Sequence, residues 1–327
     1  MRAIVIAGKG GAEVLQIRDV PTPEPRGDQV RVRVRACGLN RADLMQARGM
    51  YPAPPGASAD IPGLEYAGEV DALGPDVTGP LQLGDRVFGI VGGGGQAEFV
   101  LTPERMAVPI PSNLDFVEAA AIPEAFITAH DALIARGHLD PGGSVLIHAV
   151  GSGVGTAAVQ LAHAMGCLTF GTSRTAGKLE RARGLGLDHG IDTTTEDFAE
   201  VVRSRTDGAG ADVVIDFLGG PALAGNLAAL KTRGRLVLVG LLGGHHAPFD
   251  LNQMLRKRLT IVGTTLRARP PEEKVTATRR FADQVVPWLA RGIVRPVVDS
   301  VFSLEHVREA QARMESNEVF GKVILRV

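Results

Sequence analysis

The chain has 327 residues, of which 45% are hydrophobic, and its formal net charge is −1. These values indicate a folded protein of about two domains, and they exclude a disordered chain and a surface for polyanions. Basic blocks are absent and no apolar run approaches ~20 residues, so we expect neither nucleic-acid binding nor a membrane span. Cys37 and Cys167 are the only cysteines, which favours the cytoplasm and predicts two small buried side chains.

Residues 1–121 have the pattern of a small β-rich domain. The apolar run near the N-terminus is too short for a signal sequence and predicts a first strand. Val30–Ala36 alternates valine with arginine, which predicts an antiparallel strand with one exposed face. Shorter strands are predicted at Arg86–Ile90 and Glu98–Leu101, and proline and glycine separate these segments.

Residues 122–267 alternate strands with helices. A short apolar strand at Ser144–Ala149 runs into a glycine turn, and the apolar residues from Val154 to Met165 then recur at helical spacing. Further strands are predicted at Leu168–Gly171, His189–Ile191, Asp212–Phe217, Arg235–Val239 and Leu259–Gly263. Helices are predicted at Lys178–Leu185, Phe198–Arg205 and Ala222–Leu230. This alternation predicts an α/β fold with a doubly wound parallel sheet.

Residues 268–327 have no place in a completed six-stranded sheet. They predict a long helix at Glu272–Arg291, a strand at Val297–Phe302, a helix capped by Ser303 and a last strand at Lys322–Val327. We therefore expect this segment to return to the first domain. The predicted domains are 1–121 with 268–327, and 122–267.

The most specific local motif is the glycine turn. Its residues are Gly151, Ser152, Gly153, Val154 and Gly155. A literal G-x-G-x-x-G is absent, because Val150 and Ser152 stand at its first two glycine positions. A strand, a tight turn and a helix nevertheless aim unpaired N–H groups at one point, which suits the pyrophosphate of NAD(H) or NADP(H). The expected chemistry is hydride transfer.

The end of the next strand indicates which dinucleotide is bound. NAD-binding sites carry an acidic residue there, whereas this chain has Ser173 and Arg174, followed by Lys178. Arg174 and Lys178 can both make charge-assisted hydrogen bonds to the 2′-phosphate of NADP(H). The sequence therefore favours NADPH, and the alternative is two solvated residues at the start of a helix.

Seven segments in family order carry a resemblance to a known family: Asn40–Leu44, Tyr51–Gly56, Gly63–Glu65, Gly84–Val87, Gly94–Glu98, Ala119–Ala125 and Val145–Gly155. With them the chain resembles the zinc-free quinone oxidoreductases (zeta-crystallin-like) of the medium-chain dehydrogenase/reductase superfamily. The resemblance implies a GroES-like β-rich catalytic domain, a Rossmann NADPH-binding domain, and a homodimer or homotetramer.

The resemblance also implies that no metal is bound. Zinc-dependent relatives carry Gly-His-Glu where this chain has Gly63-Leu64-Glu65, and their catalytic cysteine aligns with Asn40. A catalytic zinc needs about three protein ligands, which these positions do not supply. Without a Lewis acid the acceptor must already be activated, as quinones and α,β-unsaturated carbonyls are.

Three catalytic residues are implied by the resemblance: Asn40, Asp43 and Tyr51. Asn40 could orient the nicotinamide carboxamide or the acceptor oxygen, and Tyr51 could donate a hydrogen bond or a proton. Further cofactor contacts are implied at Thr128, Gly240, Leu241, Leu242, Leu266, Arg267, Gly321 and Lys322. Leu266 and Arg267 could instead contact a dimer partner. Each position also has a purely structural alternative. Asn40 and Asp43 could form a turn or a helix cap, and Tyr51 could be a packing residue. Thr128 could be an ordinary helix residue, and Gly321 and Lys322 could simply begin the last strand.

The leading functional hypothesis is an NADPH-dependent quinone oxidoreductase, and both hydride and one-electron routes stay open. One alternative is an enoyl or alkenal double-bond reductase, which would use the same site with another acceptor. The other is a non-catalytic NADPH-binding protein.

Overall fold

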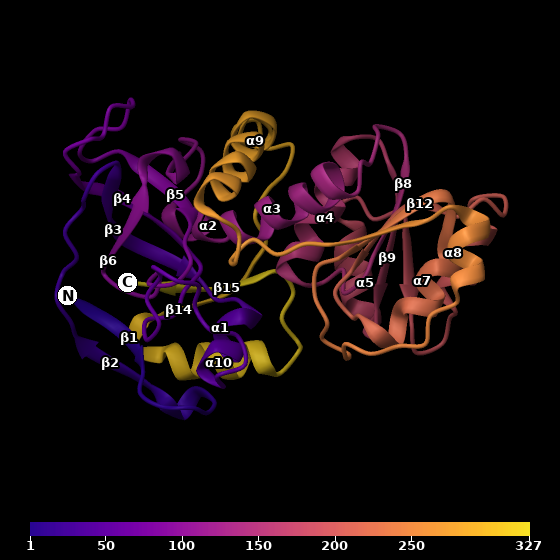
Figure 1. Cartoon of the computed structure of the whole chain (residues 1–327), viewed down its shortest axis with the longest axis horizontal. Coiled ribbons are helices and arrows are strands. Elements are labelled where there is room, and N and C mark those ends of the chain that lie inside the picture. Colours follow the sequence, from indigo (N-terminus) through magenta and orange to yellow (C-terminus); the bar gives the residue numbers. More distant parts are fainter. The chain divides into compact units, whose positions relative to one another are not determined.

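The computed structural model describes all 327 residues and divides into two compact units (Figure 1). Unit 1 comprises Met1–Ile127, Leu266–Gly292 and Pro296–Val327, and unit 2 comprises Thr128–Thr265 and Ile293–Arg295. The predicted boundaries, 121/122 and 267/268, differ from the observed 127/128 and 265/266 by a few residues. The fold class, a β-rich domain together with a parallel α/β domain, is confirmed.

Unit 1 is built on a seven-stranded sheet with the order β14-β15-β3-β4-β5-β7, and β6 pairs with β3. Its strands are β3 (Gln29–Gly38), β4 (Glu65–Leu73), β5 (Arg86–Ile90), β6 (Phe99–Pro103), β7 (Val108–Pro109), β14 (Val298–Ser303) and β15 (Lys322–Arg326). β1 (Arg2–Ile6) and β2 (Leu15–Asp19) form a separate antiparallel pair. The last strand, β15, pairs antiparallel with β3, which joins the end of the chain to the N-terminal sheet.

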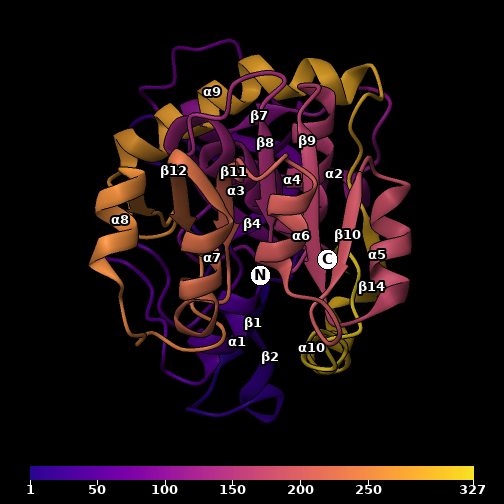
Figure 2. The same cartoon turned by 90° about the vertical axis from the view of Figure 1, so that its right-hand side faces the viewer.

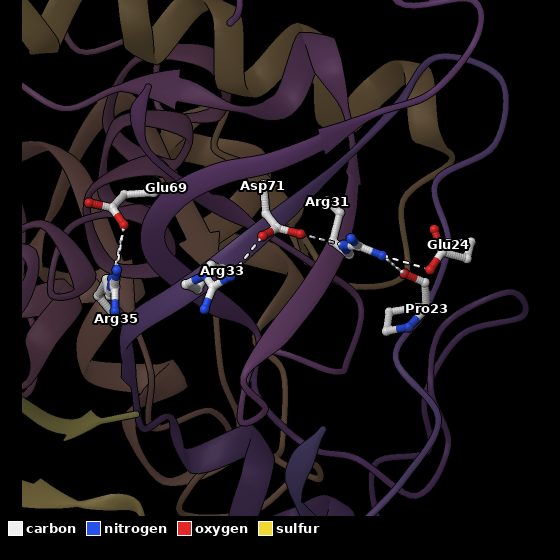
Figure 3. Close-up of polar contacts among 7 residues, drawn as sticks. All are labelled: Pro23, Glu24, Arg31, Arg33, Arg35, Glu69 and Asp71. Atoms are coloured by element: carbon white, nitrogen blue, oxygen red, sulfur yellow. Dashed lines mark hydrogen bonds and ion pairs between the residues drawn. The ribbon is translucent and has the colours of Figure 1, made fainter. Parts of the chain in front are cut away.

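The alternating strand β3 has one buried and one charged face. The valines of Val30–Val34 are at most 2% exposed. On the opposite face, Asp71 of β4 accepts hydrogen bonds from Arg31 at 2.7 Å and from Arg33 at 3.0 Å. The complete ladder consists of Arg31, Arg33 and Arg35 with their partners Glu24, Pro23, Asp71 and Glu69 (Figure 3). Arg31 and Asp71 are each 16% exposed, whereas Arg33 and Arg35 are 49% and 45% exposed. Ion pairs of such exposed arginines contribute at most about 1 kcal/mol each, so the buried valines make the larger contribution to holding the strand in place. The predicted half-exposed strand is confirmed.

Unit 2 contains a six-stranded sheet with the order β10-β9-β8-β11-β12-β13, and every pair in it is parallel. Its strands are β8 (Ser144–Ile147), β9 (Leu168–Ser173), β10 (His189–Asp192), β11 (Ala211–Asp216), β12 (Leu230–Leu238) and β13 (Thr260–Gly263). Its helices are α4 (Gly153–Ala164), α5 (Ala176–Arg183), α6 (Phe198–Ser204), α7 (Leu223–Ala229) and α8 (Leu251–Lys257). Figure 2 shows α6 and α7 in front of these strands, where their apolar residues join the buried cluster around Leu146 and Phe170.

The parallel arrangement brings the carboxyl ends of the unit 2 strands to one edge of the sheet. The glycine turn follows β8, Ser173 ends β9, Asp216 ends β11 and Gly240 lies just beyond β12. This edge is where open α/β sheets bind their ligands. The sequence predicted the six strands of this sheet and the helices α4 to α7 in this order, but it did not predict α8.

The remaining helices are α1 (Arg41–Ala47), α2 (Phe116–Ala120), α3 (Pro123–His130), α9 (Pro271–Ala290) and α10 (Val307–Glu315). Short 3-10 turns occur at Ala12–Val14, Glu104–Met106, Gly220–Ala222 and Leu304–His306, and a π-helix follows α3 at Asp131–Arg136. A membrane-spanning helix is not among them.

Two local predictions need correction. β12 begins at Leu230 rather than Arg235, because a bulge, in which Arg233 takes a positive φ of 65°, shifts its register against β11. Ser303 does not cap α10, since its hydroxyl contacts the His306 ring and a 3-10 turn precedes the helix at Val307.

We predict opposite effects for two glycine-to-alanine substitutions in unit 2. A Cβ on Gly155 would lie 2.6 Å from the Ala149 carbonyl oxygen and 2.8 Å from that of Val150, whereas a Cβ on Gly177 would meet open space. Gly155→Ala should lower the free energy of unfolding by about 1–3 kcal/mol, because rigid backbone cannot yield. Gly177→Ala should raise it by about 0.5–1 kcal/mol. Urea unfolding measures both, and equal stability of the two variants would contradict the packing of this turn.

Candidate functional site

The glycine turn of unit 2 has the form that a phosphate group requires. The Ser152 hydroxyl caps α4 by accepting a hydrogen bond from the Gly155 N–H at 3.0 Å. The N–H groups of Gly153 and Val154 lie in the first turn of α4, where they have no acceptor within the helix. Both residues are half-buried and therefore within reach of a ligand. These groups fit the pyrophosphate of a dinucleotide.

A buried polar network ties the strand ends of unit 2 together. The Thr172 hydroxyl donates to His148 Nδ1 at 2.9 Å, and His148 Nε2 donates to Asn226 Oδ1 at 2.6 Å. Asn226 in turn donates to Asp216 at 3.0 Å, which fixes its amide orientation and hence the histidine tautomer. Burial lowers the pKa of His148, so its ring is neutral. The network joins β8, β9, β11 and α7, and His148 has a structural role in it.

The end of β9 carries the residues predicted to select the dinucleotide. Ser173 is half-buried, Arg174 is exposed and Lys178 lies in the first turn of α5. Ser173 pairs in register with Asp192 of β10, an acidic residue that sequence spacing did not indicate because it belongs to another strand. Hydrogen bonds from Thr194 hold the Asp192 carboxylate and lower its pKa.

The loop after β12 is anchored on the loop after β11. The Gly240 N–H donates to the Asp216 carbonyl at 3.2 Å, and the Leu242 N–H donates to the Phe217 carbonyl at 2.9 Å. The side chains of Leu241 and Leu242 are exposed, 52% and 57% respectively. Contact between this loop and the nicotinamide stays a prediction.

Unit 1 contains a buried ion pair between the starts of β15 and β4. The Lys322 ammonium lies 2.6 Å from Glu65 Oε1, and these side chains are 6% and 0% exposed. The same ammonium donates to Asn40 Oδ1 at 2.7 Å and to the Leu39 carbonyl at 2.8 Å, which uses all three of its N–H donors. Asn40 Nδ2 also donates to Glu65 at 2.9 Å. The structure thus places Asn40 and Lys322 together around Glu65, a residue to which the sequence assigned no chemistry.

Gly321 and Gly38 allow this cluster to form. Gly321 has a φ of 98°, and a Cβ there would collide with the Val297 carbonyl. A Cβ on Gly38 would collide with the Glu65 carboxylate. The predicted cofactor contact at Gly321 stays a prediction, while its conformation explains why glycine precedes Lys322.

The Asp43 side chain links the loop before α1 to the loop before β4. Its carboxylate accepts from the Asn40 N–H at 2.8 Å and from the Gly63 N–H at 3.0 Å, and the residue is 1% exposed. Burial raises the pKa of Asp43 to about 6. In the structure it positions Asn40, and its predicted catalytic role stays a prediction.

Tyr51 and Arg267 form a second group in unit 1. The Arg267 guanidinium lies 5.1 Å from the centre of the Tyr51 ring and donates to the Tyr51 carbonyl at 3.0 Å. It also donates to the Gly92 carbonyl and to Gln46, and only 4% of it is exposed. Arg267 therefore fixes the position of the loop that carries Tyr51. The neighbouring Leu266 is 6% exposed.

Glu124 is the residue near this group that the sequence analysis missed. Its backbone N–H donates to Glu65 Oε2 at 2.7 Å, at the start of α3. Its side chain is half-buried, as is that of Thr128 one turn later. The only signal in the sequence was an acidic residue inside an otherwise apolar segment, Ala119–Ala125.

Comparisons with known proteins agree with this architecture. Residues 26–112 match the alcohol dehydrogenase GroES-like domain, and residues 153–283 match the zinc-binding dehydrogenase family model. The chain is 34% identical to the mouse synaptic vesicle membrane protein VAT-1 homolog-like, over 100% of this chain and 81% of that protein. It is 32% identical to a rat quinone oxidoreductase, over 99% of this chain and 97% of that protein.

The chain belongs to the medium-chain dehydrogenase/reductase family.

Solved structures place the same fold over the full length. A crystal structure of an NAD-dependent alcohol dehydrogenase is 34% identical, with a TM-score of 0.89 over 100% of both chains. A mycobacterial protein complexed with NADPH is 27% identical, with a TM-score of 0.87 over 100% of both chains. Unit 1 is thus the GroES-like domain and unit 2 the Rossmann domain of an oxidoreductase that binds a pyridine nucleotide.

For this medium-chain dehydrogenase/reductase we predict that the Lys322–Glu65 pair sets the stability of unit 1. Lys322→Met should lower the free energy of unfolding by about 3–5 kcal/mol, because it removes the only cation paired with the buried Glu65 carboxylate. The double variant Glu65→Gln/Lys322→Met should regain most of this loss, since it removes both charges.

Urea unfolding at neutral pH compares the single with the double variant. Equal loss in both would show that the two charges are not coupled.

Proposed function

We propose that this chain is an NADPH-dependent quinone oxidoreductase that works without zinc. The observation that carries the proposal is the Lys322 ammonium on Glu65. A cation holds the carboxylate at 2.6 Å, Leu64 is an apolar neighbour, and the Asn40 amide is engaged by both charges. This donor set does not fit a catalytic zinc, which needs about three ligands from cysteine, histidine and carboxylates.

The residues of unit 2 that would hold NADPH are those of the glycine turn and the β9 end. The turn residues Gly151–Gly155 present N–H groups to the pyrophosphate, and Ser173, Arg174 and Lys178 bind the 2′-phosphate. NADPH, when bound, supplies a hydride to the acceptor. We propose further contacts with NADPH at Thr128, the Gly240–Leu242 loop, Leu266 and Gly321.

The residues of unit 1 would receive the acceptor. Tyr51 is half-buried, and burial raises the pKa of its phenol, which therefore stays protonated and able to donate a hydrogen bond. Lys322 and Glu65 fix the Asn40 amide by hydrogen bonds. We propose that Asn40 in turn keeps these two charged side chains in place beside the acceptor. We propose quinones as acceptors because they accept a hydride without help from a metal.

We also propose that the protein forms a homodimer or homotetramer and acts in the cytoplasm. β13 ends the unit 2 sheet with one edge unpaired, and exposed leucines of α8, Leu251 and Leu255, lie on the preceding helix. Both cysteines are buried and unpaired, as the sequence predicted for small core residues.

A panel of acceptors tests the proposed function. We expect NADPH oxidation with a benzoquinone and an ortho-quinone, and the same rate after treatment with a chelator. Faster turnover of 2-alkenals or enoyl thioesters would instead identify a double-bond reductase. Tight NADPH binding with no turnover of any acceptor would favour the non-catalytic alternative, and loss of the rate on chelation would refute the metal-free site.

A substitution at the end of β9 tests the choice of nucleotide. The double variant Ser173→Asp/Arg174→Ala should weaken NADPH binding about 10–100-fold and favour NADH, because a carboxylate replaces a phosphate ligand. Ser204→Asp/Arg205→Ala, which makes the same change of net charge at two exposed residues of the same unit, is the control. Fluorescence titration with both nucleotides measures the preference, and an unchanged preference for NADPH would contradict the assignment.

A further inference from the structure

We propose that Glu124 is the proton donor of the reaction, a catalytic residue that delivers its carboxyl proton to the acceptor as the hydride is received. This inference rests on the proposed function and names the acid that this function needs. It is carried by the position of Glu124 on α3 and by the groups around it in unit 1.

The first observation is the free face of α3. Every residue of Pro123–His130 is buried except Glu124 and Thr128, which are half-buried. They are four residues apart and therefore share one face of the helix. Thr128 is a proposed cofactor contact, so the same face presents Glu124 where the acceptor is expected. No hydrogen bond of the structure engages the Glu124 carboxyl.

The second observation is the fixed negative charge beside it. Glu65 forms an ion pair with Lys322 and also accepts hydrogen bonds from Asn40 and from the Glu124 N–H. A second anion at the same place is unfavourable. The charge of Glu65 therefore favours the protonated form of Glu124.

The surrounding groups set the strength of this acid. Burial and the charges of Glu65 and Asp43 raise the pKa of Glu124 to about 8, while Lys322 and Arg267 act in the opposite direction. Tyr51 and Lys274 also lie within the electrostatic reach of Glu124. The helix N-terminus alone would favour the carboxylate, so burial and Glu65 decide the outcome. A general acid is most effective when its pKa lies near the working pH.

The proton balance is simple. The acceptor gains two electrons and one hydrogen as hydride from NADPH, and it gains the proton when the O–H bond of Glu124 breaks. A new O–H bond forms on a quinone, or a C–H bond forms on an activated alkene. The half-buried Glu124 carboxylate then recovers a proton from solvent.

Two measurements on Glu124→Gln and a control test the proposal. Glu273→Gln is the control, because Glu273 is an exposed glutamate of the same unit. Infrared difference spectra of the protein without substrate should show a protonated carboxyl band that disappears with a midpoint near pH 8 in the wild type and the control. Glu124→Gln should lack this band.

In steady-state assays with a quinone, Glu124→Gln should lower kcat about a hundredfold or more, while NADPH binding is unchanged. The wild-type kcat should fall as pH rises through the Glu124 pKa, and the variant should lose this dependence. An unchanged kcat in Glu124→Gln, or survival of the infrared band, would overturn the proposal while leaving the proposed function intact. Absence of turnover in the wild type would refute the function and the catalytic role together, whatever the infrared band shows.

Discussion

The buried contact between Lys322 and Glu65 is the constraint on which unit 1 depends. It connects the last strand, β15, to β4, and through Asn40 and the Glu124 N–H it also fixes the starts of α1 and α3. A buried ion pair is costly to desolvate and very costly to break, so its partners must be placed together. At the proposed acceptor site, Asn40 and the start of α3 are positioned by this contact, whereas Tyr51 is positioned by Arg267.

Unit 2 uses a different principle. Its six parallel strands end at one edge, where the glycine turn supplies backbone N–H groups and the network from Thr172 through His148 and Asn226 to Asp216 fixes the neighbouring strand ends. The groups proposed to bind the pyrophosphate are thus backbone N–H groups. We propose that Ser173, Arg174 and Lys178 at the end of β9 select the nucleotide, and Asp192 lies in register with Ser173.

The fold could be predicted well from the sequence, since periodicity and turn residues are local signals. The alternation of valine and arginine in β3 and the strand–turn–helix at Gly151–Gly155 are examples. The site could be predicted only in part. Asn40 and Lys322 were found by resemblance, but their meeting at Glu65 depends on pairing of β15 with β3, which no local pattern encodes. Asp192 and Glu124 were missed for the same reason, because their importance comes from neighbours distant in sequence.

The central claim is that a hydride passes directly from NADPH to an acceptor in a site organised by these charges. The most direct measurement is a single-turnover stopped-flow experiment with NADPH carrying deuterium on one or the other face of its nicotinamide C4. The account predicts slower oxidation with one of the two labels and an unchanged rate with the other. Equal rates with both labels and with unlabelled NADPH would contradict it.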